Sequence, residues 1–180
     1  MRKLILVLLL GLSFNQVKNG DRHSIPSSLC WVNNILLQKS NQVDSLQQYK
    51  QKLAILESSN DYSAINSYGY MGKYQFSKKT LRRLNFSQKE IDNFLNSKEL
   101  QERAIDTLTR HNESILRGYG LASHVGSRIE GITITMNGML AGAHLRGPYS
   151  VKKFIESNGT IDHEDGYGTR VSDYLKLFQN

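Results

Sequence analysis

The sequence predicts a mainly α-helical fold: one helical domain with a small β-hairpin or loop region after its first helix. Proline occurs at only two of the 180 positions, Pro26 and Pro148, which leaves long stretches open to helix formation. In these stretches apolar residues recur at spacings of three and four, often just after a residue that caps helices. The hydrophobic content of 39% suits a folded domain and excludes a chain that is disordered throughout.

The N-terminus has the pattern of a targeting segment. Two basic residues, Arg2 and Lys3, precede the apolar stretch 4–12. This stretch is shorter than the ~20 residues that span a bilayer, and its pattern is that of a secretory signal peptide. We therefore expect residues 1–20 to be removed, and the mature protein to be secreted or periplasmic with no integral membrane span. The alternative is a buried N-terminal helix.

The net charge is moderately basic. The chain has 23 Lys and Arg against 16 Asp and Glu, a formal charge of +7, and loss of residues 1–20 would leave 20 against 16, or +4. Basic residues are scattered, apart from the pairs Lys78-Lys79, Arg82-Arg83 and Lys152-Lys153. A nucleic-acid-binding protein usually shows a denser stripe. The charge therefore favours an acidic cell-surface polymer as partner and no nucleic acid.

The first predicted helix follows a polar segment. Residues 21–43 are rich in Asn, Gln, Ser and Lys and are interpreted as a spacer. Asp44 offers a cap for an amphipathic helix over 45–58, with Lys50 and Lys52 off its apolar stripe. That stripe consists of Leu46, Tyr49, Leu53 and Leu56. Residues 59–76 contain turn-forming Asn, Asp and Gly, and a short β-hairpin is expected around 68–76.

The next three helices are predicted from their caps. Ser77 precedes a helix through Leu84, and Ser87 with Glu90 forms a capping box. Ser97 opens a longer helix that ends at the glycines 118 and 120.

Three further helices are expected in the C-terminal part. After a Gly-flanked loop, residues 133–145 form a helix of small residues and residues 148–157 form another. A last helix opens at Thr169 or Ser172.

Glu57 breaks the pattern of the first helix. It lies four residues after Leu53, where the apolar face runs into a loop rich in Gly and Tyr. A carboxylate beside an apolar surface loses hydration, which favours its protonated form and suits it to deliver a proton to a leaving oxygen. Flat aromatic rings and planar amides next to this acid are typical of a sugar cleft. They are Tyr62, Tyr68, Tyr70 and Tyr74, with Asn60, Asn66 and Gln75.

Residues 55–76 resemble the catalytic stretch of the lysozyme-like lytic transglycosylases, and also that of resuscitation-promoting factors and phage-associated muramidases. The shared order is Glu-Ser, an acidic and aromatic turn, Ala-x-Asn, Gly, and Gly-x-x-Gln. The resemblance implies an α+β lysozyme-like domain over residues 44–180. It also implies that Glu57 is the catalytic acid and that Gln75 lines the cleft.

A second stretch, residues 140–155, is similar to a later motif of this family. His144 stands where the family has Tyr, and Leu145 where it has Asn. Tyr174 resembles the closing tyrosine of the family. The substrate-binding residues that this resemblance and the aromatic loop imply are Ser58, Asn66, Tyr70, Tyr74, Gln75, His144 and Tyr174.

The resemblance also implies a chemistry. Most glycoside hydrolases use two carboxylates, but after Asp61 no Asp or Glu follows until Glu90. In the family, one Glu protonates the glycosidic oxygen of peptidoglycan and then removes the 6-hydroxyl proton, which yields a 1,6-anhydro-muramyl end. No cofactor is involved. The histidines have no metal-ligand spacing and Cys30 is the single cysteine, so we expect no metal and no intramolecular disulfide.

Other functions remain open. A hydrolytic muramidase or chitinase-like enzyme would need a base, for which Asp61 or the loop 162–165 is available. The departures at His144 and Leu145 leave room for a glycan-binding module without activity. His144 itself fits either a contact with substrate or Glu57, or a place in the core. We expect a monomer.

Overall fold

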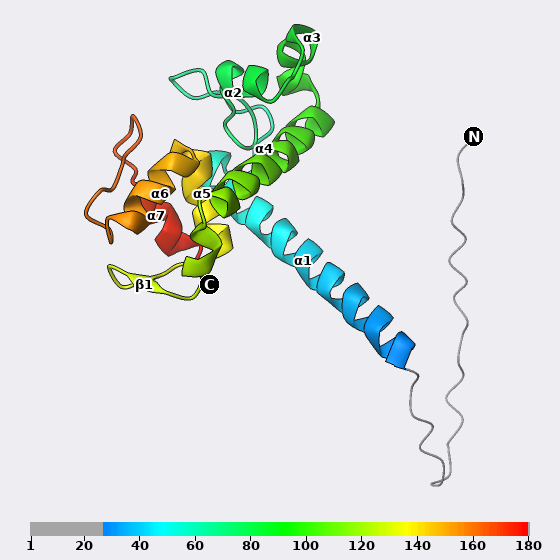
Figure 1. Ribbon diagram of the computed structural model, residues 1–180. Helices are drawn as coiled ribbons and strands as arrows, with labels where there is room; N and C mark the ends of the chain where they lie inside the picture. The colour runs from blue at the N-terminus through cyan, green and yellow to red at the C-terminus, as the bar shows by residue number, and fades with distance from the viewer. Residues whose placement is uncertain (1–26, 180) are drawn as a thin grey trace. The chain divides into compact units, whose positions relative to one another are not determined.

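The computed structural model describes residues 27–179, and its contacts divide the chain into the units Met1–Ser40 and Asn41–Asn180. The predicted signal peptide, residues 1–20, and the following residues up to 26 lie outside the described residues. Within the second unit the fold is mainly helical with one two-stranded sheet (Figure 1), so the predicted fold class is confirmed at this level.

The helices and strands follow one another without a repeated unit. The α-helices are α1 Ser27–Ser58, α2 Lys78–Arg83, α3 Gln88–Asp92, α4 Lys98–Gly118, α5 Met136–Arg146, α6 Pro148–Glu156 and α7 Val171–Leu177. The 3₁₀ helices are η1 Phe94–Asn96 and η2 Leu121–His124, and the strands are β1 Arg128–Ile129 and β2 Ile132–Thr133.

Helix α1 starts earlier than predicted. It begins at Ser27, so residues 27–43 of the predicted spacer are helical, and position 44 lies inside the helix and not at its start. No proline follows Pro26 here, and Leu, Gln and Lys all favour helix. A polar composition indicates only that a segment is exposed to water, and an exposed segment can be a helix as well as a loop.

The buried face of α1 is rotated from the predicted one. Tyr49 and Leu53 are buried as expected, but Leu46 and Leu56 are 39% and 41% exposed. Lys50, predicted to lie outside the stripe, is only 8% exposed. Positions 49, 53 and 57 are four residues apart and share a face. The buried face of α1 therefore leads directly to Glu57.

Helix α5 is the centre of the C-terminal half, where it packs against α7, α6 and α4 (Figure 1). Two of its glycines make the close approach to α7 and α6 possible. A Cβ at Gly138 would lie 3.3 Å from the carbonyl oxygen of Leu175, and one at Gly142 would lie 3.1 Å from Val171 and 3.2 Å from Val151. A side chain at either glycine would therefore be in very close contact with α7.

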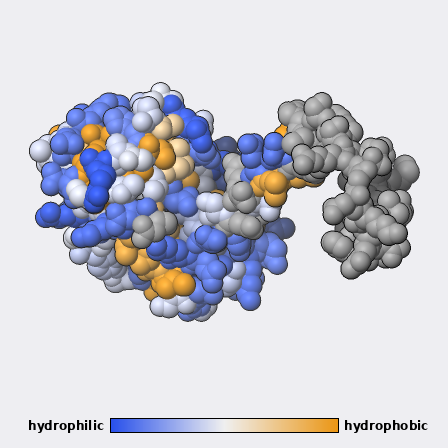
Figure 2. All heavy atoms as spheres, turned by 90° about the horizontal axis from the view of Figure 1, so that it is seen from below, coloured by the Kyte–Doolittle hydropathy of each residue, from blue (hydrophilic) through white to orange (hydrophobic). Residues whose placement is uncertain are grey.

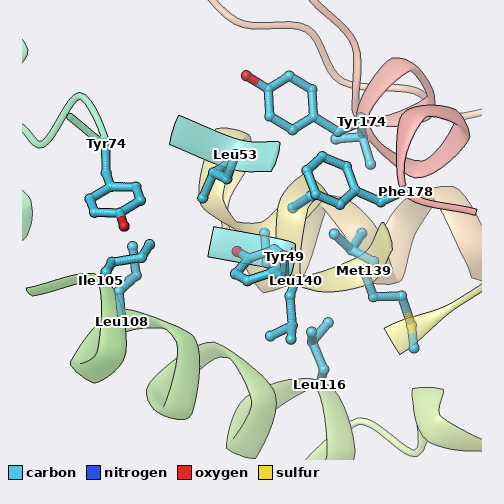
Figure 3. Packing of buried hydrophobic residues seen from close by; sticks show 14 of the residues in the cluster. Tyr49, Leu53, Tyr74, Ile105, Leu108, Leu116, Met139, Leu140, Tyr174 and Phe178 are labelled. Carbon is cyan, nitrogen blue, oxygen red and sulfur yellow. The ribbon is translucent and has the colours of Figure 1, made fainter. Parts of the chain in front are cut away.

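The hydrophobic core joins α1 to this helical layer. Figure 3 shows the rings and aliphatic side chains that meet there from α1, α4, α5 and the end of α7. The ring centroids of Tyr49 and Phe178 are 5.7 Å apart. Lys52 of α1 also donates a hydrogen bond to the carbonyl of Leu177 at the end of α7. The end of α1 that carries Glu57 is thus held against α7.

The predicted helix caps are confirmed at three positions. The Ser77 and Ser97 hydroxyls accept from the N–H groups of Thr80 and Leu100, and Ser87 forms a capping box with Glu90. Two helix starts were predicted wrongly. Helix α5 begins after the cap Thr135 because residues 132–133 pair in β2, and α7 begins after Arg170, whose N–H donates to Asp173.

The small sheet lies in a different place from the predicted hairpin. Residues 68–76 form a loop with isolated bridges, Ile65 to Met71 and Met71 to Phe76. The hairpin is β1–β2, in a segment predicted to be a loop. Its turn residues Glu130 and Gly131 have φ of 48° and 76°, the left-handed conformation that a tight hairpin turn needs. Glycine adopts this conformation readily, but glutamate rarely does, so the sequence offers little indication of a turn at Glu130.

The loop 59–76 is held to α4 by one carboxylate. Glu102 accepts hydrogen bonds from Tyr62 at 2.8 Å, from Lys73 at 3.0 Å and from Tyr74 at 3.0 and 3.1 Å. It also pairs with Lys50 of α1 at 2.8 Å. Partial burial acts to raise the pKa of Glu102, but these hydrogen bonds outweigh it and lower the pKa to about 2.

The adjacent Gln101 holds the backbone of the same loop. Its side chain is buried, accepts from the N–H of Lys73 at 2.8 Å and donates to the carbonyls of Tyr62 at 2.9 Å and Phe94 at 3.1 Å. Gly72 lies directly against it, since a Cβ there would be 2.2 Å from the Gln101 oxygen. Helix α4 therefore fixes both the side chains and the main chain of the loop.

The surface seen in Figure 2 is mainly hydrophilic, with separate hydrophobic patches. Lysine and arginine occur throughout the sequence and outnumber aspartate and glutamate by 23 to 16, which gives the charge of +7. Among residues 27–179, none of the helices combines the length and the apolar character needed to cross a membrane.

We expect Glu102→Gln to destabilise the fold by about 2–3 kcal/mol, because Lys73, with a side chain only 14% exposed, loses its counter-ion and Lys50, only 10% exposed, keeps Asp106 alone. Glu113→Gln is the matched control: its side chain on the same helix is also 31% exposed, but its partner Arg117 is 57% exposed. That change should cost less than ~0.5 kcal/mol. Urea unfolding at pH 7 measures both, and equal losses would contradict the role of Glu102.

The same contact gives a pH dependence. A carboxylate with a lowered pKa stabilises the fold above its unfolded value, 4.5, and this contribution is lost as the pH falls towards about 2. The difference in unfolding free energy between wild type and Glu102→Gln should therefore shrink between pH 4.5 and 2. A difference that stays constant over this range would contradict it.

Candidate functional site

A cavity of about 500 Å³ opens where the end of α1, the loop 59–76, α5 and α7 meet. Most of the side chains around it are polar or aromatic. They are Leu56, Glu57, Asn66, Tyr68, Tyr70, Gln75, His144, Leu145, Asp165, Tyr167, Thr169 and Tyr174, together with Gly166. The size and the mixture of rings and hydrogen-bonding groups suit a small organic ligand or one or two sugar units.

Glu57 and Tyr174 form a hydrogen-bonded pair in this cavity. The Tyr174 hydroxyl donates to Oε1 of Glu57 at 2.8 Å, and the Glu57 side chain is only 14% exposed. Burial, and then the negative charge of Glu57, raise the pKa of the Tyr174 phenol. Tyr174 therefore keeps its proton and remains a donor at any ordinary pH. Among the described residues, nothing donates a hydrogen bond to Oε2 of Glu57.

His144 lies beside this pair without bonding to it. Its Nε2 is 3.0 Å from the carbonyl oxygen of Tyr74 and 3.7 Å from Oε1 of Glu57. A carbonyl only accepts, so Nε2 carries the hydrogen and donates it to Tyr74. The ring packs edge-on against Phe76, with centroids 5.8 Å apart. His144 thus lines the cavity with a side chain only 7% exposed, and it also anchors the loop to α5.

The loop brings two amides to the cavity in fixed conformations. Gln75 has a φ of 49°, which is uncommon for a residue other than glycine, and its side-chain amide donates to the carbonyl of Gly72 at 2.9 Å. The side-chain oxygen of Asn66 accepts from the N–H groups of Tyr68 and Tyr70, both at 3.0 Å. Such strained and locally bonded conformations often occur at functional sites.

Two loops meet at one edge of the cavity. The rings of Tyr68 and Tyr167 are in edge contact with centroids 4.8 Å apart. The hydroxyls of Ser67 and Tyr167 are 2.8 Å apart, and Tyr68 donates to the carbonyl of Gly166 at 3.2 Å. Tyr68 and Tyr167 are 60% and 59% exposed, so part of each ring remains accessible to a ligand. Flat exposed rings of this kind stack on sugars.

The structure brings most of the predicted site residues together. Those that line the cavity are Glu57, Asn66, Tyr70, Gln75, His144 and Tyr174. Ser58 and Tyr74 do not line it. The Ser58 hydroxyl donates to the carbonyl of Lys73 at 2.9 Å, and the buried Tyr74 donates to Glu102. Both predicted contacts with substrate are replaced by contacts that hold the loop, because these side chains lie on the inner side of the chain.

Sequence reasoning considered Asp165 only as part of a candidate base loop and missed the contribution of Tyr167 and Thr169. Asp165 and Tyr167 line the cavity, and the Asp165 carboxylate accepts from the N–H groups of Tyr167 at 2.8 Å and Thr169 at 2.9 Å. The sequence Asp-Gly-Tyr-Gly signals a turn with an exposed aromatic ring, as Tyr68-Gly69-Tyr70 does. What it does not signal is that the two turns face each other across 98 positions.

The two candidate bases are now distinguished. Asp61 does not line the cavity; it accepts hydrogen bonds from the N–H and hydroxyl of Ser63 at 2.8 and 2.7 Å, which lower its pKa. Asp165 shares the cavity with Glu57. Within residues 27–179, no group of three or more His, Cys, Asp and Glu side chains is placed to hold a metal ion.

Scans of the chain against protein-family models, curated proteins and solved structures found no match. The cavity and the motifs around it are therefore the basis for a functional proposal.

We expect Gly72→Ala to destabilise the fold by about 2–4 kcal/mol, because the new Cβ meets a buried Gln101 amide held by three hydrogen bonds. Gly69→Ala is the matched control in the same loop. Gly69 has a similar φ, 77° against 75°, but a Cβ added there would have no atom within 4 Å, so the change should cost only ~1 kcal/mol of backbone strain. Thermal unfolding of the two variants measures the difference, and equal losses would rule out the contact with Gln101.

Proposed function

We propose that this chain is an exported enzyme that cleaves the β-1,4 glycosidic bond between N-acetylmuramic acid and N-acetylglucosamine in peptidoglycan. The observation that carries the proposal is the pair of Glu57 and Tyr174, which places a largely buried carboxylate in a cavity lined by aromatic rings and amides. The order of motifs from Glu57 to Tyr174 supports a lysozyme-like fold, and the N-terminal sequence supports export.

In this proposal Glu57 is the general acid. Protonated Glu57 gives its proton to the glycosidic oxygen as the bond to the sugar breaks. Tyr174 holds Oε1, so Oε2, which receives no hydrogen bond among the described residues, is the oxygen that faces the substrate. Tyr174 is a positioning residue here, since it acts through Glu57. Tyr68 and Tyr167 stack on the sugar rings at the edge of the cavity.

The second step decides between two reaction types. In a lytic transglycosylase, the Glu57 carboxylate removes the proton of the 6-hydroxyl group, and the sugar closes into a 1,6-anhydro ring without water. In a hydrolase of the inverting kind, a second carboxylate activates water on the other side of the ring. Asp165 is the residue that favours this second candidate, because it lines the same cavity. Two N–H groups already engage its Oδ1, which favours the transglycosylase.

We expect Glu57→Gln to reduce the rate of peptidoglycan cleavage by about 10²–10⁴-fold, because the amide keeps the shape but has no proton to give. Asp61→Asn, which changes a carboxylate outside the cavity, is the control and should keep the wild-type rate. Release of soluble fragments from purified peptidoglycan measures both, and circular dichroism checks that both variants fold. A Glu57→Gln variant with wild-type rate would exclude Glu57 as the acid.

The products separate the two reaction types. A transglycosylase releases fragments that are ~18 Da, one water, lighter than those of a hydrolase, and mass spectrometry detects this difference directly. We expect the lighter products from the wild type, and Asp165→Asn should keep its rate within a few-fold because the side-chain oxygen that accepts both N–H groups is retained. Heavier products together with an inactive Asp165→Asn would identify a hydrolase.

A further inference from the structure

A second cavity, of about 530 Å³, adjoins the first. The two share four residues, Tyr70, Gln75, His144 and Leu145, which therefore form a boundary between them. On the far side of this boundary the wall is the loop around Phe76 and helix α2. A ligand longer than one cavity can thus extend past Gln75 and His144 towards α2.

The two cavities differ in charge. Lys79 and Arg83 line the second cavity, and none of its lining residues is acidic. The first cavity contains the carboxylates of Glu57 and Asp165 and neither lysine nor arginine. The cleft therefore runs from an acidic end to a basic end, and a negatively charged group is attracted to the second cavity and repelled from the first.

The two cations are placed together by the helix. Lys79 and Arg83 are four residues apart and lie on one face of α2. Both are exposed, and within residues 27–179 neither takes part in an ion pair, although several other lysines and arginines do. Lys78 and Arg82 also lie four apart on α2 but do not line the cavity, and Arg82 donates to Gln88 instead.

We infer that the second cavity binds a carboxylate-bearing branch of the substrate. This rests on the proposed function: in peptidoglycan, such branches are the stem peptides carried by the muramic acid residues, which have free carboxylates. Lys79 and Arg83 hold the carboxylates of one stem while Glu57 meets the glycosidic bond in the first cavity. The neutral N-acetylglucosamine units have no such branch, so the pair sets the direction and register in which the strand lies in the cleft.

The test compares two ligands that differ only in charge. Soluble stem-bearing glycan strands are used either as they are or after their carboxylates have been converted to neutral amides. Binding is measured by calorimetry in a Glu57→Gln background, so that the strands stay intact. The variants are Lys79→Ala/Arg83→Ala and, as matched control with the same loss of charge on the same helix, Lys78→Ala/Arg82→Ala.

We expect Lys79→Ala/Arg83→Ala to weaken binding of the native strands about tenfold and to leave binding of the amidated strands unchanged. The control variant should change either affinity less than about twofold, and the tenfold effect should shrink as salt is added. The inference is overturned if the variant weakens both ligands equally, or if the control loses as much.

A parallel assay of wild-type cleavage keeps this result distinct from the proposed function. Wild-type protein that cleaves native strands while the charge variants show no selective loss would overturn only the role of the second cavity. Wild-type protein that neither binds nor cleaves either ligand would overturn the proposed function and this inference together.

Discussion

The candidate site depends on the contact between α4 and the loop 59–76. Glu102 gathers two lysines and two tyrosines around one carboxylate, and the adjacent Gln101 fixes the loop backbone. The loop has no regular strand pairing of its own, since its bridges are isolated. The two α4 side chains thus help to hold the loop that brings Asn66 and Gln75 to the cavity. A partly buried charge is acceptable here because each oxygen of Glu102 has a donor.

The other wall of the cavity depends on close helix packing. Gly138 and Gly142 allow α7 to approach α5 more closely than larger residues would, and α7 carries Tyr174. The contacts of Tyr49 and Lys52 with the end of α7 hold α1 against α7. The hydrogen bond from Tyr174 to Glu57 is thus the result of three packed helices. His144 on α5 then links this wall to the loop through the carbonyl of Tyr74.

These two walls give a cleft with distinct ends. The tyrosine contact between Tyr68 and Tyr167 lies at the end that contains Glu57, and the cations of α2 lie at the other. A polymer with alternating neutral and anionic sugar units matches this arrangement, because rings recognise the sugars and charge recognises the branches. The scattered net charge of the chain, +7, gives no hint of this local separation.

The sequence by itself determined the helical class, the caps at Ser77, Ser87 and Ser97, and the place of Glu57 at the end of an amphipathic helix. These features depend on contacts within four residues, which a sequence displays directly. Tertiary structure alone decided which face of α1 is buried, where Lys50 pairs with Glu102 and Asp106 of α4, and which groups meet Glu57. Tyr174 lies 117 positions away from it. Such partners are chosen by packing between distant segments, and no local pattern records that packing.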